Sequence, residues 1–145
     1  GFDLKPSALN PEKIRLEWLE KGSDLYFNAH SLSDGTLRMM CLATLLLQPN
    51  PPSTIIIDEP ELGLHPAAIH LLASLIKMAA ERTQVIISTQ SVTLINQFTP
   101  QDIIVVDRKE GQSVFRHIDD NELALWQEEY ALGEIWEKNL IGGRP

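Results

Sequence analysis

The sequence predicts an α/β fold with a mostly parallel sheet and flanking helices, preceded by a β-hairpin and followed by a helical tail. Residues 54–57 are β-branched and apolar without alternation, which is typical of a parallel strand covered on both faces. Two similar strands are expected at 84–88 and 103–106. Helices at 66–81 and near 91–97 separate the three. This alternation indicates right-handed crossovers and a parallel sheet.

Length and composition exclude several classes of protein. The chain has 145 residues and a net charge of −8, with 43% hydrophobic residues, which suits one domain or a piece of one. Its longest apolar stretch, Met39 to Leu47, is too short to span a membrane, and no signal segment precedes it. Cys41 has no possible partner, so a disulfide scaffold is excluded and a reducing cytoplasm fits best. The acidic pI is unfavourable for a nucleic-acid-binding surface.

The N-terminal part, residues 1–30, is expected to be an irregular lead-in over 1–12 followed by a β-hairpin over 13–29. Ile14, Leu16 and Trp18 alternate with charged residues, as in a strand with one buried face. The run 21–24 has the composition of a turn, and the alternation resumes after it.

The central part, residues 31–118, contains the expected core. Ser33 is a good N-cap for a helix that ends at the proline-rich run 48–52. Pro66 suits the first position of the next helix. An edge strand is expected at 112–117. The tail, 119–145, is acidic and is expected to be helical to about 141 and to dock on an apolar surface. Its apolar residues form two stripes, Leu123, Trp126 and Tyr130, and then Trp136 and Leu140.

Asp58 and Glu59 are the first candidates for chemistry. They follow strand 54–57 at its carboxyl end, which is the edge where open α/β sheets bind ligands. Asp58 suits a Mg²⁺ ion held through water, and Glu59 could orient or deprotonate a water molecule. The alternative is that both are solvated residues at the end of a strand.

The segment 31–38 is the second candidate, because it opens a helix. A helix N-terminus has unpaired N–H groups that favour a phosphate, Ser33 adds a hydroxyl, and Gly35 allows close approach to the backbone. The alternative is an ordinary N-cap on a buried helix.

Four segments together resemble ABC-type P-loop ATPases of the RecF/SMC-like, overcoming-lysogenisation-defect-like branch, a group of AAA-type ATPases. Their order and spacing agree with that family from about residue 31 to 107. Leu32-Ser33-Asp34-Gly35-Thr36 is similar to the signature motif, and Ile55-Ile56-Ile57-Asp58-Glu59 to Walker B. Glu61-Leu62-Gly63-Leu64-His65-Pro66 is similar to the loop after Walker B, and Ile87-Ser88-Thr89-Gln90-Ser91 lies where a switch histidine is expected.

The resemblance implies a role for each segment. Asp58 would help to hold Mg²⁺, and Glu59 would be the catalytic base. Ser33, Asp34 and Gly35 would meet the ATP held by a second protomer, so the resemblance implies a homodimer. Leu62, Gly63 and His65 would lie in a loop at that interface, although His65 is also explained as a residue at the start of a helix.

Three departures from the family pattern qualify these roles. Gln90 replaces the usual histidine; it can still act as catalytic residue by donating to the γ-phosphate or positioning a water, but it cannot take up a proton. Asp34 puts a negative charge near a phosphate unless it turns away to cap the helix. The chain has no G-x-x-x-x-G-K-[ST] phosphate loop.

The missing phosphate loop predicts that this chain is a single partial domain, the C-terminal half of the ATPase fold. The start at Gly1 rather than Met fits that prediction. The strand that carries the loop would lie between strands 84–88 and 103–106, so strand 84–88 should show an unpaired apolar edge. Two other functions stay open: a nucleotide-gated regulatory module with little turnover, and an unrelated α/β interaction domain. DNA contact could come only through regions outside this acidic segment, and no membrane contact is expected.

Overall fold

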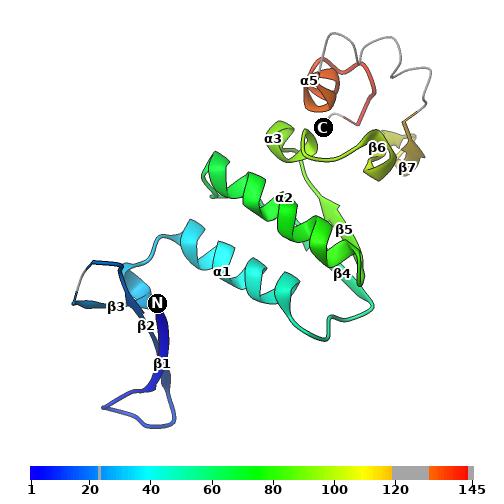
Figure 1. The fold of residues 1–145 in the computed structure, drawn as a ribbon. Helices are drawn as coiled ribbons and strands as arrows, with labels where there is room; N and C mark the ends of the chain where they lie inside the picture. The colour runs from blue at the N-terminus through cyan, green and yellow to red at the C-terminus, as the bar shows by residue number, and fades with distance from the viewer. Residues whose placement is uncertain (23, 119–130, 144–145) are drawn as a thin grey trace.

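The computed structural model describes residues 1–22, 24–118 and 131–143. Figure 1 shows three regions along the chain: a small N-terminal sheet, a central group of helices and strands, and a C-terminal group at the opposite end from the N-terminal sheet. The α/β class predicted from the sequence is confirmed. No helix within these ranges has the length and apolar character needed to cross a membrane.

The N-terminal sheet has three antiparallel strands in the order β1-β2-β3, spanning Phe2–Pro6, Ile14–Leu19 and Tyr26–Asn28. The hairpin of β2 and β3 matches the prediction, with Trp18 opposite Phe27. The prediction of an irregular lead-in over residues 1–12 was wrong, because β1 pairs with β2 along its whole length. Phe2 and Leu4 alternate with Asp3 and Lys5, and the prolines obscured that period. A proline is tolerated at Pro6 because β1 is an edge strand.

Helix α1 spans Asp34–Leu47 and begins where the sequence predicts. The Ser33 hydroxyl accepts a hydrogen bond from the Thr36 N–H at 3.2 Å, which satisfies one of the free donors of the first turn. A short 3-10 helix, η1 (Ala29–Ser31), connects it to the N-terminal sheet. The cap therefore fixes the start of the candidate signature segment.

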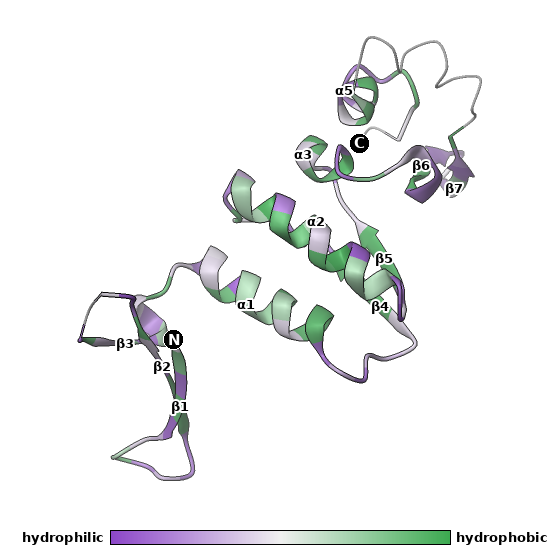
Figure 2. Ribbon diagram, in the orientation of Figure 1, coloured by the Kyte–Doolittle hydropathy of each residue, from purple (hydrophilic) through white to green (hydrophobic). Residues whose placement is uncertain are grey.

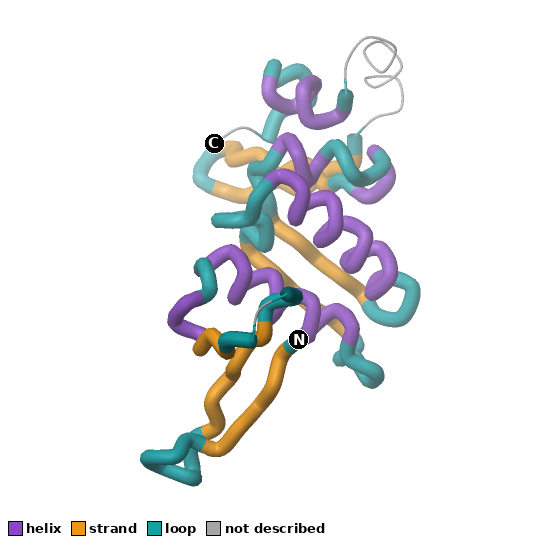
Figure 3. Tube along the Cα trace, turned by 60° about the vertical axis from the view of Figure 1, so that its left-hand side comes forward, coloured by secondary structure: helices purple, strands orange, loops and turns teal. Residues whose placement is uncertain are grey.

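The central sheet consists of two parallel strands, β4 (Thr54–Asp58) and β5 (Gln84–Ser88), joined by helix α2 (Pro66–Ala80). Helices α1 and α2 lie side by side over one face of the strand pair (Figure 3). The buried core between them includes Leu42, Leu46, Ile55 and Leu72. Proline at the first helical position of α2 agrees with the sequence prediction.

The second face of the central sheet differs from the prediction. Strand β4 was expected to be covered on both faces, yet Ile56 is 75% exposed and Ile86 is 46% exposed. Both strands are strongly hydrophobic (green in Figure 2). The described helices cover the face of Ile55 and Ile57, and no described residue covers the other face.

The C-terminal region has its own small core. Helix α3 (Val92–Ile95) and the 3-10 helix η2 (Pro100–Asp102) lead to the antiparallel pair β6 (Ile104–Lys109) and β7 (Gln112–His117). Helix α5 (Leu132–Glu137) packs against this pair through a buried cluster of Val105, Ile118, Ile135 and Ile141.

One expectation for this region is met and another needs amendment. Strand β6 is not hydrogen-bonded to β5, as predicted if a further strand separates them, so the parallel sheet within the described residues is the pair β4–β5. The expected helical tail is helical only over α5 in its described part, because the chain turns at 138–141. Buried Ile135 and Ile141 make the contact there, whereas Leu140 is 37% exposed. The predicted stripe of Leu123, Trp126 and Tyr130 lies outside the described residues.

Candidate functional site

The carboxyl ends of β4 and β5 bring the first group of candidate residues together. Asp58 is the register partner of Ser88, and its Oδ1 accepts a hydrogen bond from the Ser88 hydroxyl. The N–H of Glu59 donates to the Ser88 carbonyl at 2.9 Å, which continues the pairing one residue past the strand. The sheet therefore places both carboxylate residues beside the segment 88–91, where the switch residue was predicted.

Glu59 has an unusual backbone conformation, with φ at 41°. Left-handed conformations are uncommon for residues other than glycine, and they persist where surrounding contacts hold them. The carbonyl of Glu59 accepts a 2.9 Å hydrogen bond from the Arg38 guanidinium on α1. This contact between α1 and the turn after β4 was missed from the sequence, because twenty residues separate the partners in the chain and no local pattern relates them.

The loop 59–65 is held to the switch segment by a second contact. The Thr89 hydroxyl donates to Glu61 Oε1 at 2.5 Å. Glu61 Oε2 is buried and has no hydrogen-bond partner among the described residues. Glu61 and Thr89 both lie within motif segments, but the sequence predicted a role for neither. A glutamate and a threonine far apart in the chain do not indicate a contact by their residue types alone.

The other residues of this loop shape its exit into α2. Gly63 has φ at 77°, a conformation in which a side chain would be strained. His65 is the N-cap of α2, and its Nδ1 accepts from the Ala67 N–H at 3.2 Å. This cap supports the structural explanation for His65. Leu62, Gly63 and His65 are exposed, as a loop at an interface requires.

Within the signature segment, Ser33 and Asp34 are exposed, and Gly35 meets the loop 59–65. A Cβ atom built at position 35 would overlap the Gly63 carbonyl oxygen. The space that was expected to admit a ligand is therefore filled by this chain's own backbone. Ser33 also pairs with the Thr36 hydroxyl at 2.9 Å. The described contacts explain Ser33 and Gly35 structurally, and their role toward ATP stays a prediction.

Gln90 lies between the end of β5 and the start of α3, and it is exposed. The residues on either side of it are bonded to one another, since the Ser91 N–H donates to the Thr89 hydroxyl at 3.0 Å. Ser91 in turn caps α3 by accepting from the Leu94 N–H. A short turn with fixed ends thus presents the Gln90 side chain to solvent.

The donor chemistry at the sheet edge fits Mg²⁺. Asp58 and Ser88 supply a carboxylate and a hydroxyl, which are hard oxygen donors at an exposed position. The described residues contain no group of three or more potential ligands of the His, Cys, Asp or Glu type. This arrangement suits an ion that keeps most of its water and is held also by phosphate oxygens, rather than one enclosed by protein.

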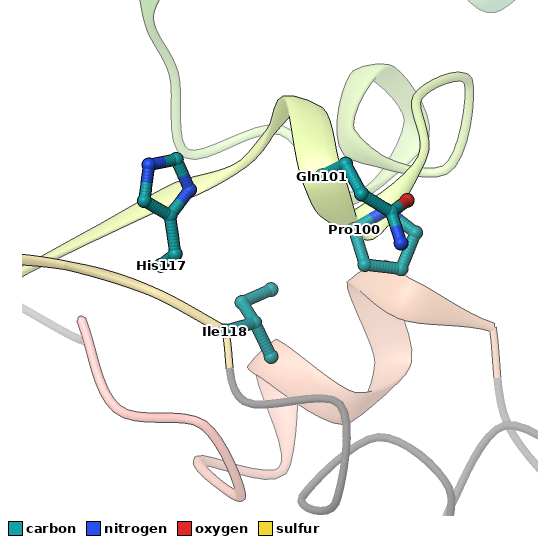
Figure 4. Close-up of a pocket in the computed structure, with 4 residues that line it drawn as sticks. All are labelled: Pro100, Gln101, His117 and Ile118. Carbon is teal, nitrogen blue, oxygen red and sulfur yellow. The ribbon is translucent and has the colours of Figure 1, made fainter.

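A separate cavity of about 340 Å³ lies between η2 and the end of β7 (Figure 4). Pro100, Gln101, His117 and Ile118 line it. None of these residues belongs to the predicted motifs, and the lining has no carboxylate. The edge of β4 and β5 is therefore the stronger candidate for a functional site.

Comparison with known proteins identifies the family of the chain. Residues 3–96 match the family model described as "AAA domain, putative AbiEii toxin, Type IV TA system". The chain is 32% identical over 102 residues to ABC transporter A family member 11 of Dictyostelium discoideum, a match over 63% of this chain. It spans only 12% of that transporter's length.

Solved structures of SMC ATPases share the fold. One chain, from work on ATP-driven dimerization and DNA-stimulated activation of SMC ATPases, matches 89% of this chain and 81% of its own length, with 22% identity and a TM-score of 0.64. The Smc head domain of Pyrococcus furiosus, determined with the C-terminal domain of ScpA, gives a TM-score of 0.63 at 22% identity over 89% of this chain and 33% of its own length. The family match over residues 3–96 shows that the chain belongs to this AAA domain family, and the SMC structures show that it shares the fold of SMC ATPase heads.

Proposed function

We propose that this chain is the C-terminal half of an ATPase core that binds and hydrolyses ATP between two protomers. The observation that carries the proposal is the edge of the central sheet, where β4 and β5 bring Asp58, Glu59 and the turn around Gln90 to one place. Membership in the AAA domain family supports ATP hydrolysis as the reaction class. It also argues against the alternative of an unrelated α/β interaction domain with a coincidental carboxylate pair.

In this proposal the residues at the sheet edge divide the work. Asp58, with Ser88, holds Mg²⁺, which supplies charge neutralisation at the phosphates when bound. Glu59 accepts the proton of the attacking water, and Gln90 orients that water or donates to the γ-phosphate. The hydrogen bond from Arg38 fixes the carbonyl of Glu59 and so limits where its side chain can reach.

The proposed N-terminal half would carry the phosphate loop and complete the sheet. Parallel sheets are normally covered on both faces, but the face of Ile56 and Ile86 is bare. The edge of β5 away from β4 has no partner strand among the described residues. A groove of about 230 Å³ runs beside β5, and Val85, Ile87, Leu94 and Phe98 are among its lining residues. An apolar strand between β5 and β6 would fill it.

The second protomer would complete the site from outside. Ser33 and Asp34 are exposed at the start of α1, and the loop of Leu62, Gly63 and His65 is exposed as well. These surfaces are free to meet ATP and the partner in a homodimer. The SMC relative dimerises in response to ATP and is activated by DNA. A net charge of −8 is unfavourable for DNA contact, so in this proposal any DNA-binding surface lies outside this chain.

Gln90 favours a second candidate, a nucleotide-gated regulatory module with little turnover. A glutamine amide can bind a phosphate oxygen, yet it cannot take up a proton as a switch histidine can. Steady-state phosphate release from the full-length protein separates the two candidates, because a regulatory module would bind ATP and dimerise with almost no release.

The first experiment replaces the proposed base in the full-length protein that carries this chain. Glu59→Gln should lower kcat by about 10²–10⁴-fold, since that is the usual contribution of a general base. It should also accumulate an ATP-bound dimer, measured by light scattering. Glu81→Gln, at the exposed end of α2, is the matched control and should leave both unchanged. Normal turnover in Glu59→Gln would remove Glu59 from the reaction.

The second experiment tests the missing half. Calorimetry with Mg-ATP should detect no micromolar binding to the 145-residue chain alone, because the phosphate cradle lies elsewhere. Adding the phosphate-loop half should restore binding. Micromolar binding to the chain alone would contradict the proposal that this is half of the site.

A further inference from the structure

Hydrogen bonds connect helix α1, the loop 59–65 and the segment 88–91. Arg38 on α1 donates to the Glu59 carbonyl at 2.9 Å. Two residues later, Glu61 Oε1 accepts from the Thr89 hydroxyl at 2.5 Å. The Thr89 oxygen also accepts from the Ser91 N–H at 3.0 Å. Glu61 is therefore the side chain through which the loop 59–65 reaches the turn around Gln90.

The Thr89 hydroxyl is fully oriented by these contacts. It has one proton to donate and receives one N–H bond, so its rotation is fixed between Glu61 and Ser91. Gln90 lies between Thr89 and Ser91, and Ser91 is anchored to α3 through the Leu94 N–H. The backbone of Gln90 thus depends on the position of Thr89.

If its only function were packing, a carboxylate at this position would lower the stability of the fold. Glu61 Oε2 is buried without a hydrogen-bond partner among the described residues, which is an unfavourable state for an oxygen of this kind. An apolar pair of similar shape would hold two loops together with little or no loss of stability. The directional bond to Thr89 is what an apolar pair cannot supply.

We propose that Glu61 is a positioning residue for hydrolysis, which sets the place of Gln90 through the Thr89 hydroxyl. The inference rests on the proposed ATPase function and adds a role that Asp58, Glu59 and Gln90 do not fill. Because Gln90 acts on the terminal phosphate or its attacking water, a displaced Gln90 slows the chemical step and leaves ground-state binding of ATP nearly intact.

The test compares variants on both sides of the bond in the full-length protein. Glu61→Ala and Thr89→Val remove the acceptor and the donor, and each should lower kcat by about 10–100-fold, as is common for residues that orient a reacting group. KM for ATP should stay within about threefold, since uniform binding is unchanged. Thr89→Ser and Glu61→Gln keep a donor and an acceptor, so their kcat should stay near the wild-type value.

The double variant Glu61→Ala/Thr89→Val supplies an internal control, because it should be no slower than the slower single variant if one bond carries the effect. Turnover near wild type in Glu61→Ala and Thr89→Val would overturn the inference, and so would a raised KM with unchanged kcat. If Glu61→Ala does not fold, Thr89→Val decides the outcome. A wild-type protein that binds ATP but releases no phosphate would instead overturn the proposed hydrolysis, and this inference with it.

Discussion

The central sheet and the C-terminal hairpin differ in how far their apolar side chains are buried. Strands β4 and β5 form a parallel pair with one covered face, while Ile56 and Ile86 are bare on the other. Strands β6 and β7 form an antiparallel pair whose core with α5 includes Val105 and Ile135. The C-terminal core closes within the described residues, whereas none of them covers this second face of the central sheet. The difference supports the proposal that a further half of the fold covers the region with the predicted motifs.

The comparison predicts that truncating two neighbouring residues of β4 has very different effects on stability. Ile55 is 4% exposed and Ile56 is 75% exposed. Ile55→Ala should lower the free energy of unfolding of the 145-residue chain by about 2–4 kcal/mol, because it leaves a cavity in the core. Ile56→Ala should change it by less than about 0.5 kcal/mol.

The same pair of variants then tests whether a second half of the protein buries the face of Ile56. In the full-length protein the cost of Ile56→Ala should rise above about 1 kcal/mol if a second half buries that face. Urea denaturation of both forms measures the difference. An equal, small effect of Ile56→Ala in both would show that the face stays bare.

Gly35→Ala probes how tightly the motif segments pack in the central region. The added methyl would meet the Gly63 carbonyl, and overpacking of this kind costs about 1–3 kcal/mol. Alanine favours a helix over glycine, which offsets up to about 1 kcal/mol. We therefore expect a net loss of stability by urea denaturation. Cys41→Ala, at an exposed site on the same helix, should be neutral.

Asp107→Ala probes the C-terminal region. Asp107 Oδ1 accepts the Gly143 N–H at 2.7 Å and its carboxylate lies 3.8 Å from Arg116. Loss of this half-buried acceptor should lower the free energy of unfolding by about 1 kcal/mol. ATP turnover by the full-length protein should be unchanged, because the hairpin core is separate from the motif edge. Coupled loss of turnover would contradict that separation.

The smallest expected effect concerns η2, which joins the two regions. The Thr99 hydroxyl, and then the Thr99 N–H, hold the pKa of Asp102 below its usual value of 3.8. A lowered pKa stabilises the fold above the unfolded value, and this contribution is lost as pH falls through the folded value. Because Asp102 is exposed and solvent screens its interactions, Asp102→Asn should cost at most about 0.5 kcal/mol at pH 7, and the cost should disappear once the pH is below the folded pKa. A constant difference across that range would exclude the carboxylate as the cause.

Much of the fold could be predicted where local chemistry decides it. Ser33 and Pro66 mark helix starts, and β4 and β5 follow from their β-branched runs. Strand β1 was missed because its pairing with β2 is a tertiary contact that Pro6 and Pro11 made improbable. The bare face of Ile56 was missed because an apolar sequence specifies that burial is favourable but not which element supplies the cover.

The candidate site likewise contains residues that the sequence predicts and contacts that only the fold reveals. Motif order predicts roles for Asp58, Glu59 and Gln90, since each lies at or just after the end of a recognisable strand. The contacts of Arg38, Glu61 and Thr89 join segments far apart in the chain, and only the fold reveals them. Gly35 was predicted to let a ligand approach the backbone, whereas the structure shows its small size accommodating the Gly63 carbonyl.

The close approach of Gly35 to Gly63 has a mechanical consequence. Together with the bond from Arg38 to Glu59, it leaves little freedom for α1 to slide against the loop 59–65. If the proposed ATP site opens and closes, α1 and the turn after β4 would therefore move together as one rigid body, and bending would occur elsewhere in the chain.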